Sequence, residues 1–191
     1  VLGTTIVVKK IIDKPIKEKG ITTHKVCGDL ICGGASNAGC GILSKFFSDL
    51  EIKELSRQIN PSKKTSLNSN EKRILKDLKL NDIKLICLAG FMKILSKDFI
   101  RNFKGKILNI HPSLLPKYKG LNTHHRAIQN KEKYSGCTVH LVNSKLDSGK
   151  IILQKKVKLS KKETPSSLQK KILKHEHILY PRAISKIFVN L

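Results

Sequence analysis

A short apolar segment, Ile83 to Ala89 (IKLICLA), restricts the possible folds of this chain more than any other feature. The segment has no alternation of apolar and polar residues, and Gly90 closes it. This pattern is typical of a strand buried on both faces of a parallel sheet. The preceding segment, Asn70 to Leu80, carries its apolar residues at near-helical spacing. A helix followed by a doubly buried strand predicts an α/β domain.

The chain after Gly90 continues the alternation of helices and strands. Ser96 is the expected N-cap of a short helix with Asp98 in its first turn. The later elements are a strand over Lys106 to Ile110, a helix over Thr123 to Gln129, strands over Thr138 to Val142 and Ile151 to Leu159, and a long helix from Thr164 and Pro165 toward Tyr180-Pro181. We therefore expect a mostly parallel, twisted sheet with helices on both faces.

Length and composition predict a single domain, residues 1–191, because 39% of the residues are apolar and no Gly/Ser linker divides the chain. No apolar run is long enough to span a membrane, and Val1 to Gly20 lacks the pattern of a signal peptide. The five cysteines are odd in number and form no Cys-x-x-Cys pair, so we expect reduced thiols and a cytoplasmic location. The histidines lack companion ligands at zinc spacing, and we expect no metal.

The net charge of +24 raises the question of a nucleic-acid or membrane partner. Only five of the 38 basic residues are Arg, which is the residue that reads base edges best. The Lys residues are spread along the chain, and no aromatic residues are interleaved with them to stack bases. We expect a Lys-rich solvated surface without a specific nucleic-acid or membrane partner, although a basic nucleic-acid module remains an alternative. A positive field would also help to capture phosphorylated small molecules.

The strongest chemical signal is Asn109 and His111 at the end of a predicted strand. Side chains at i and i+2 share a face, and Pro112 ends the strand directly after the histidine. Asp147, in a turn between two strands, could reach the imidazole, raise its pKa and fix its tautomer. The amide could stabilise an oxyanion while the imidazole moves a proton, as attack of an amine on a carbonyl requires. The alternative is purely structural, namely a hydrogen-bonded core histidine and two turn residues.

Neither Ser nor Cys stands at a strained nucleophile elbow, so direct transfer is more natural than a covalent intermediate. Four ordered motifs then carry a resemblance to a known family. They are Leu88-Ala-Gly-Phe-Met-Lys-Ile-Leu95, Leu108-Asn-Ile-His-Pro-Ser-Leu-Leu-Pro116, Gly136-Cys-Thr-Val-His-Leu-Val142 and Leu146-Asp-Ser-Gly-Lys-Ile-Ile-Leu-Gln154. In this order they resemble the folate-dependent phosphoribosylglycinamide formyltransferase family, over about Asn70 to Pro181.

The resemblance implies a Rossmann-like formyltransferase fold and transfer of a formyl group from 10-formyltetrahydrofolate to the amine of glycinamide ribonucleotide, without a metal. By the same resemblance, Asn109 stabilises the oxyanion, His111 is the catalytic histidine and Asp147 tunes it. It also implies a folate site and a ribonucleotide contact. The folate residues would be Met92, Lys93, Ile94, Leu95, Asn109 and His140, and the ribonucleotide contact would be Glu176. The family usually has Arg at the position of Lys93.

Related families share the Asn-x-His and Asp framework. Methionyl-tRNA formyltransferase resembles this core with an added tRNA-binding domain, and formyltetrahydrofolate deformylase has an added regulatory domain; we expect neither in 191 residues. By the resemblance, we expect residues 1–69 to form the atypical, nucleotide-phosphate half, and residues 70–181 the folate-binding and catalytic half. The phosphate loop could be Gly3-Thr4-Thr5 or lie within Gly33 to Asn37. A folate-binding remnant or weak hydrolase is the alternative, and both monomer and homodimer remain open.

Overall fold

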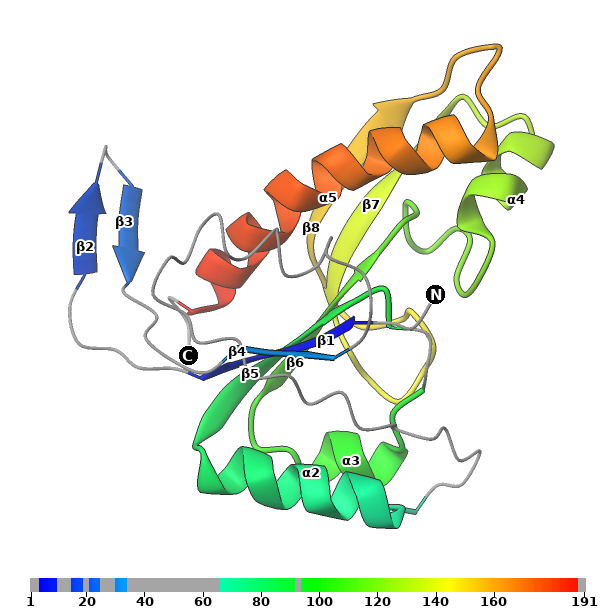
Figure 1. The fold of residues 1–191 in the computed structure, drawn as a ribbon. Coiled ribbons are helices and arrows are strands. Elements are labelled where there is room, and N and C mark those ends of the chain that lie inside the picture. Colours follow the sequence, from blue (N-terminus) through cyan, green and yellow to red (C-terminus); the bar gives the residue numbers. More distant parts are fainter. Residues whose placement is uncertain are drawn as a thin grey trace.

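The computed structural model describes residues 4–9, 15–18, 21–24, 30–33, 66–91 and 94–188. A six-stranded sheet with the order β4-β1-β5-β6-β7-β8 forms its centre (Figure 1). Its strands are β1 (Thr4–Lys9), β4 (Leu30–Gly33), β5 (Ile83–Ala89), β6 (Lys106–His111), β7 (Tyr134–Leu141) and β8 (Ile151–Lys158). Two further strands, β2 (Pro15–Glu18) and β3 (Ile21–His24), pair only with each other in the described part of the chain.

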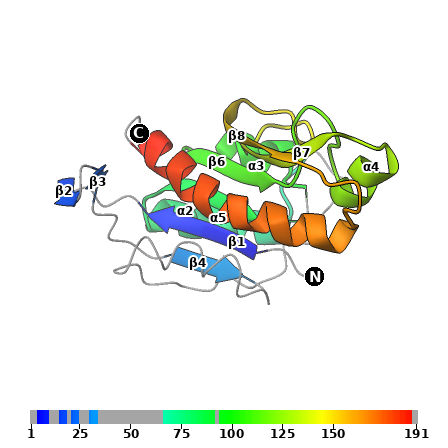
Figure 2. The ribbon, with the colours of Figure 1, turned by 90° about the horizontal axis from the view of Figure 1, so that it is seen from above.

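Helices cover both faces of the central strands, as Figures 1 and 2 show. On one face α5 (Pro165–Phe188) packs on Leu85 and Cys87 of β5, and on the other α2 (Ser69–Leu80) and α3 (Lys97–Asn102) pack on Ile86 and Leu88. A short helix, α4 (Thr123–Gln129), lies near the start of α5. The doubly buried strand predicted from Ile83 to Ala89 is thereby confirmed, as is the α/β class.

The sheet is mixed rather than mostly parallel, which corrects the expectation from the sequence. Within the described strands, β5 and β6 pair in parallel, whereas the four other neighbouring pairs of the six-stranded sheet are antiparallel. Parallel pairing needs a crossover that returns the chain to the same end of the sheet, and the segment containing α3 provides one. Residues 142–150 instead join adjacent ends of β7 and β8 directly, so these strands run in opposite directions.

Most element boundaries follow the predicted signals. Asn68 caps α2 with a capping box, and the Ser96 side chain accepts from Phe99 N at the start of α3, as expected. Strand β7 begins four residues before the predicted Thr138, because Tyr134 to Cys137 pair with β8. Helix α5 continues through Pro181 to Phe188 instead of ending near the proline. Ala183, Ile184 and Ile187, after the proline, are buried against the sheet, and this packing holds the helix together.

The amino-terminal predictions are tested only in part. Thr4 and Thr5 lie in strand β1, so they are not part of a phosphate-binding loop. Gly33 ends β4 opposite Thr5, and residues 34–37 of the alternative loop lie outside the described residues. Cys87 and Cys137 are free and buried, and burial raises the pKa of each thiol to about 12. None of the described helices combines the length and apolarity needed to cross a bilayer.

Candidate active site

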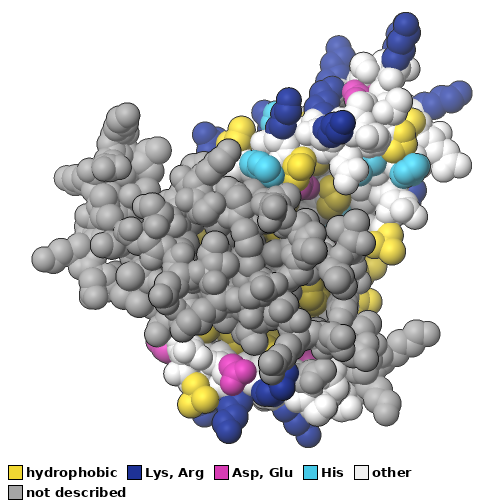
Figure 3. Space-filling view, viewed as in Figure 1, with side chains coloured by type: hydrophobic (Ala, Val, Ile, Leu, Met, Phe, Trp, Pro, Cys, Tyr) yellow, Lys and Arg dark blue, Asp and Glu magenta, His cyan; other side chains and the backbone are white. Residues whose placement is uncertain are grey.

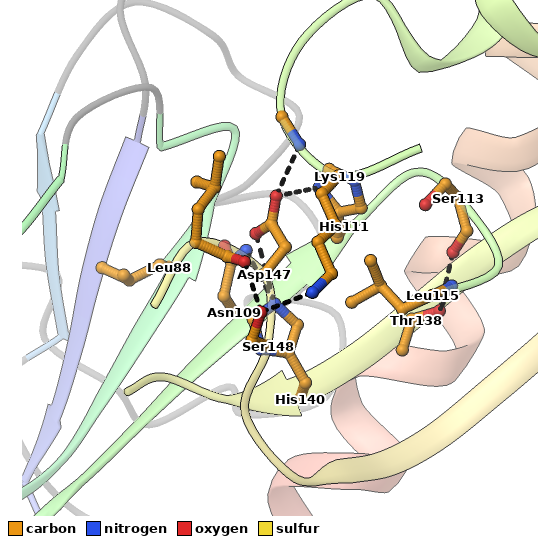
Figure 4. A network of polar contacts seen from close by, with 12 residues as sticks. Leu88, Asn109, His111, Ser113, Leu115, Lys119, Thr138, His140, Asp147 and Ser148 are labelled. Atoms are coloured by element: carbon orange, nitrogen blue, oxygen red, sulfur yellow. Dashed lines mark hydrogen bonds and ion pairs between the residues drawn. The ribbon is translucent and has the colours of Figure 1, made fainter. Parts of the chain in front are cut away.

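Strands β6 and β7 place four polar side chains on one face of the sheet. Leu108 and Ile110 point into the core beneath α5, so the alternate residues Asn109 and His111 point to the opposite face. In the antiparallel register Asn109 faces His140 and His111 faces Thr138. Figure 4 shows these side chains together at the end of β6. The structure therefore confirms the prediction that the side chains of Asn109 and His111 lie on the same face of the strand.

The loop between β7 and β8 brings Asp147 to the same place. Its carboxylate lies between two imidazoles, with Oδ2 3.5 Å from Nδ1 of His111 and Oδ1 3.6 Å from Nε2 of His140. The N–H of Gly120 donates to Oδ2 at 2.8 Å. Asp147 has a φ of 42°, in the left-handed region that Asp tolerates better than most residues. The carboxylate, amide and imidazole from two separate stretches thus converge.

Backbone carbonyls fix the protons on both histidines, because a carbonyl oxygen only accepts. Nε2 of His111 donates to the Tyr118 carbonyl at 2.9 Å, which leaves Nδ1 facing Asp147. Nδ1 of His140 donates to the Leu141 carbonyl at 2.9 Å, so its Nε2 accepts from Nδ2 of Asn109 at 3.3 Å. This contact orients the Asn109 amide and leaves its second N–H for another acceptor.

The pKa of His111 differs from the sequence-based expectation. Burial lowers the pKa of His111 below its ordinary 6.5, although the Tyr118 carbonyl and Asp147 both favour the charged form. The predicted effect of Asp147 has the expected sign, but the loss of hydration outweighs it. For Asp147, burial alone would raise the pKa, yet the contact with His140, the Gly120 N–H and attraction to either histidine in its protonated form lower it overall. The pair therefore rests as a carboxylate beside a neutral imidazole near pH 7.

The side chain of Thr138 holds the segment after His111, a role that was not predicted from the sequence. Thr138 Oγ1 donates to the Ser113 carbonyl at 2.6 Å and accepts from Leu115 N at 3.1 Å. Gln154 Nε2 donates to the same hydroxyl at 2.7 Å. The Tyr118 carbonyl and Gly120 N–H, which touch the catalytic candidates, were also missed. Both are backbone groups, so no residue type announces them in a sequence.

The sequence around these side chains matches a known protein family. The family model described as formyl transferase matches residues 48–184. The chain belongs to the formyl transferase family. The matched range includes every described element from α2 to β8 and most of α5, and therefore both stretches that form the site.

Several relatives within the formyl transferase family are similar to this chain. Phosphoribosylglycinamide formyltransferase of Escherichia coli is 38% identical over 63% of the chain and 57% of the relative, and that of Haemophilus influenzae is 48% identical over 53% and 48%. The solved phosphoribosylglycinamide formyltransferase of Brucella melitensis is 40% identical with a TM-score of 0.64, covering 78% of this chain and 74% of that one. The chain thus spans about half the length of these two bacterial curated relatives, and the formyltransferase fold predicted from the motifs is confirmed.

The remaining residues predicted from the family resemblance occupy different places. Ile94 is 60% exposed and Leu95 is buried, whereas Met92 and Lys93 lie outside the described residues. Glu176 is on α5, and its carboxylate is near enough to Cys137 and Tyr180 to raise their pKa values. Cys137 packs under α5, on the sheet face opposite His140, so no described contact joins Glu176 to the other candidates. Among the described residues no cluster of three or more His, Cys, Asp or Glu could hold a metal.

Proposed function

We propose that the chain transfers a formyl group from 10-formyltetrahydrofolate to the amine of glycinamide ribonucleotide. The observation that carries the proposal is the convergence of Asn109, His111 and Asp147. The proposal is also supported by similar proteins that bear the name phosphoribosylglycinamide formyltransferase. The substrates proposed are small molecules, with no nucleic-acid or membrane partner. A cytoplasmic location is part of the proposal, and the free, buried Cys87 and Cys137 agree with it.

The reaction exchanges one C–N bond for another. As the ribonucleotide amine attacks the formyl carbon, the formyl oxygen gains negative charge, and the second N–H of Asn109 is available to stabilise it. His111 takes the proton lost by the amine at Nδ1, where the carboxylate of Asp147 stabilises the resulting imidazolium. The bond from the formyl carbon to the folate nitrogen then breaks, and His111 returns the proton to that nitrogen. No external oxidant or reductant is required.

A covalent route through Ser113, Cys87 or Cys137 lacks support. Ser113 donates its hydroxyl to the Lys117 carbonyl at 2.7 Å, and the thiols of Cys87 and Cys137 are buried with pKa values of about 12. A thiol protonated to that degree is a poor nucleophile. Direct transfer between the two substrates is the simpler mechanism for this site.

The first test is formyl transfer with both substrates, followed by the formation of tetrahydrofolate. His111→Ala and Asp147→Asn should each lower kcat by about 100-fold or more, the usual contribution of a general acid-base group. His125→Ala is a control, because His125 is exposed on α4. Wild-type protein without turnover, or a fully active H111A variant, would contradict the proposal.

Hydrolysis of the formyl donor is a second candidate. Thr4 and Thr5 lie in a strand, so this candidate phosphate loop is lost, and hydrolysis would follow if no other segment binds the ribonucleotide. The same three residues could then direct water to the formyl group. Calorimetry would show binding of a folate analogue without binding of glycinamide ribonucleotide, and formate would accumulate in place of the formylated ribonucleotide.

A further inference from the structure

The orientation of His111 depends on a backbone carbonyl in an uncommon conformation. Tyr118, which accepts from Nε2 of His111, has a φ of 55°, in the left-handed region. For a residue with a large side chain this conformation costs free energy, so other contacts must compensate for it. The local hydrogen bonds and packing of Tyr118 show what compensates.

Side chains from the segment between α4 and β7 hold the Tyr118 hydroxyl. It donates to Oε1 of Glu132 at 2.8 Å and accepts from Nδ2 of Asn130 at 3.0 Å. The guanidinium of Arg126 lies over the Tyr118 ring, 5.2 Å from its centre. Hydrogen bonds from Lys117 and Tyr118 lower the pKa of Glu132, so the acceptor stays ionised. The hydroxyl is therefore held by two hydrogen bonds and the ring by a cation–π contact.

We propose that Glu132, through the Tyr118 hydroxyl, is a positioning residue that holds the Tyr118 carbonyl on Nε2 of His111. Tyr118 and Glu132 line a pocket of about 310 Å³, whereas Asn109, His111 and Asp147 do not line it. The described hydrogen bonds of Glu132 are with Lys117 and Tyr118, so its link to His111 runs through Tyr118. Its effect is to keep the proton of neutral His111 on Nε2 and to leave Nδ1 free to accept a proton beside Asp147.

Only the expected loss of kcat rests on the proposed function; the effect of Glu132 on the His111 tautomer does not. The tautomer of His111 can be measured in the free protein from the nitrogen resonances of ¹⁵N-labelled histidine, without substrates. The measurement belongs near pH 8, above the lowered pKa of His111, where the ring is neutral. The wild-type protein should show His111 with its proton on Nε2.

The decisive variants remove the hydroxyl anchor and keep the ring or the loop. Tyr118→Phe and Glu132→Ala should both release the carbonyl, mix the two tautomers of His111 and lower kcat about tenfold, with KM changed less than twofold. Glu132→Gln retains an oxygen that accepts from Tyr118 and should restore the Nε2–H tautomer and most of kcat. Lys117→Ala is the matched control, because Lys117 contacts Glu132 at 2.8 Å but donates no side-chain hydrogen bond to Tyr118.

Two results would overturn the inference. One is a His111 that keeps its Nε2–H tautomer in both Y118F and E132A. The other is a K117A variant that changes the tautomer as much as E132A does, since the cause would then be general loosening of the loop. Circular dichroism and thermal unfolding establish that each variant is folded. An inactive wild-type protein with the predicted tautomer changes would refute the proposed function and leave the positioning role intact.

Discussion

His111 is buried and Glu176 is partly buried, and the loss of hydration shifts their pKa values in opposite senses. Burial favours the neutral form of each, so it lowers the pKa of His111 and raises that of Glu176 to about 7. For His111 the neutral form is the one that accepts a proton in the proposed reaction. For Glu176 the neutral form is a carboxylic acid that can donate a hydrogen bond from α5.

Glu176 should make the stability of the protein depend on pH near neutrality. Its pKa is about 7 in the folded chain against 4.5 ordinarily, so the folded state binds more protons between these values. This group therefore destabilises the fold above pH 7, and the penalty disappears as the pH falls toward 4.5. Glu176→Gln should raise the free energy of unfolding by about 3 kcal/mol at pH 8, with little difference from wild type near pH 4.5. Urea unfolding at several pH values measures the difference.

Glu163 provides a control of opposite sign. Hydrogen bonding to Ser167 is the main cause that lowers its pKa to about 2, so the ionised form stabilises the fold above pH 4.5. Glu163→Gln should lower stability at pH 8, and the difference should shrink as the pH falls toward 2. A Glu176→Gln variant whose gain in stability did not depend on pH would show that the carboxyl is ionised in the folded state.

At the scale of elements, one buried carboxylate joins the two helices on the lower face of the sheet in Figure 1. Glu71 of α2 is 2% exposed and accepts from two backbone N–H groups, that of Asn68 at 3.2 Å and that of Ser96 at 2.9 Å. Ser96 in turn caps α3 through Phe99 N. Glu71 therefore sets the end of the segment that contains Ile94 and Leu95.

Glu71→Ala should destabilise the protein by about 2 to 4 kcal/mol, because two N–H groups lose a charged acceptor and one of them is buried. Glu71→Gln keeps one acceptor oxygen and should cost about half as much. The free energy of unfolding in urea gives both values. Asp77→Ala on the same helix is the matched control, because the only hydrogen bonds described for Asp77 use its backbone carbonyl. Equal losses in E71A and D77A would contradict the role of Glu71.

An element could be predicted from the sequence when the contacts that define it lie between residues close together in the chain. Ser96 and Ile83 to Ala89 were predicted well because a cap and a doubly buried strand depend on neighbouring residues. The direction of β7 depends on pairing across the sheet, and the carbonyl of Tyr118 depends on contacts with α4 and Glu132, so neither has a local signal. Asn109 and His111 were found because they share one face at the end of a strand, and Asp147, which by itself is typical of a turn, was found from its place in the ordered motifs.

At the scale of the whole molecule, the net charge of +24 is distributed over several elements. On the face shown in Figure 3, Lys and Arg side chains lie both near the start of α5 and below α2 and α3. A dispersed charge of one sign produces a long-range positive field rather than a shaped binding surface. Such a field increases the rate at which phosphorylated, anionic substrates arrive, without contributing to the chemical step.

The field predicts a specific dependence on salt. Between about 0.01 M and about 0.15 M salt the Debye length falls from about 30 Å to about 8 Å, which screens long-range attraction but not contacts within the site. The kcat/KM for glycinamide ribonucleotide should fall at least about threefold over this range while kcat stays nearly constant. An analogue of the ribonucleotide without its phosphate is the control, because its kcat/KM should change much less.

If kcat/KM were independent of salt, the positive charge would have no part in substrate capture. If tRNA or duplex DNA bound tightly at about 0.15 M salt, the charge would serve a nucleic-acid partner instead, since purely ionic contacts weaken steeply there.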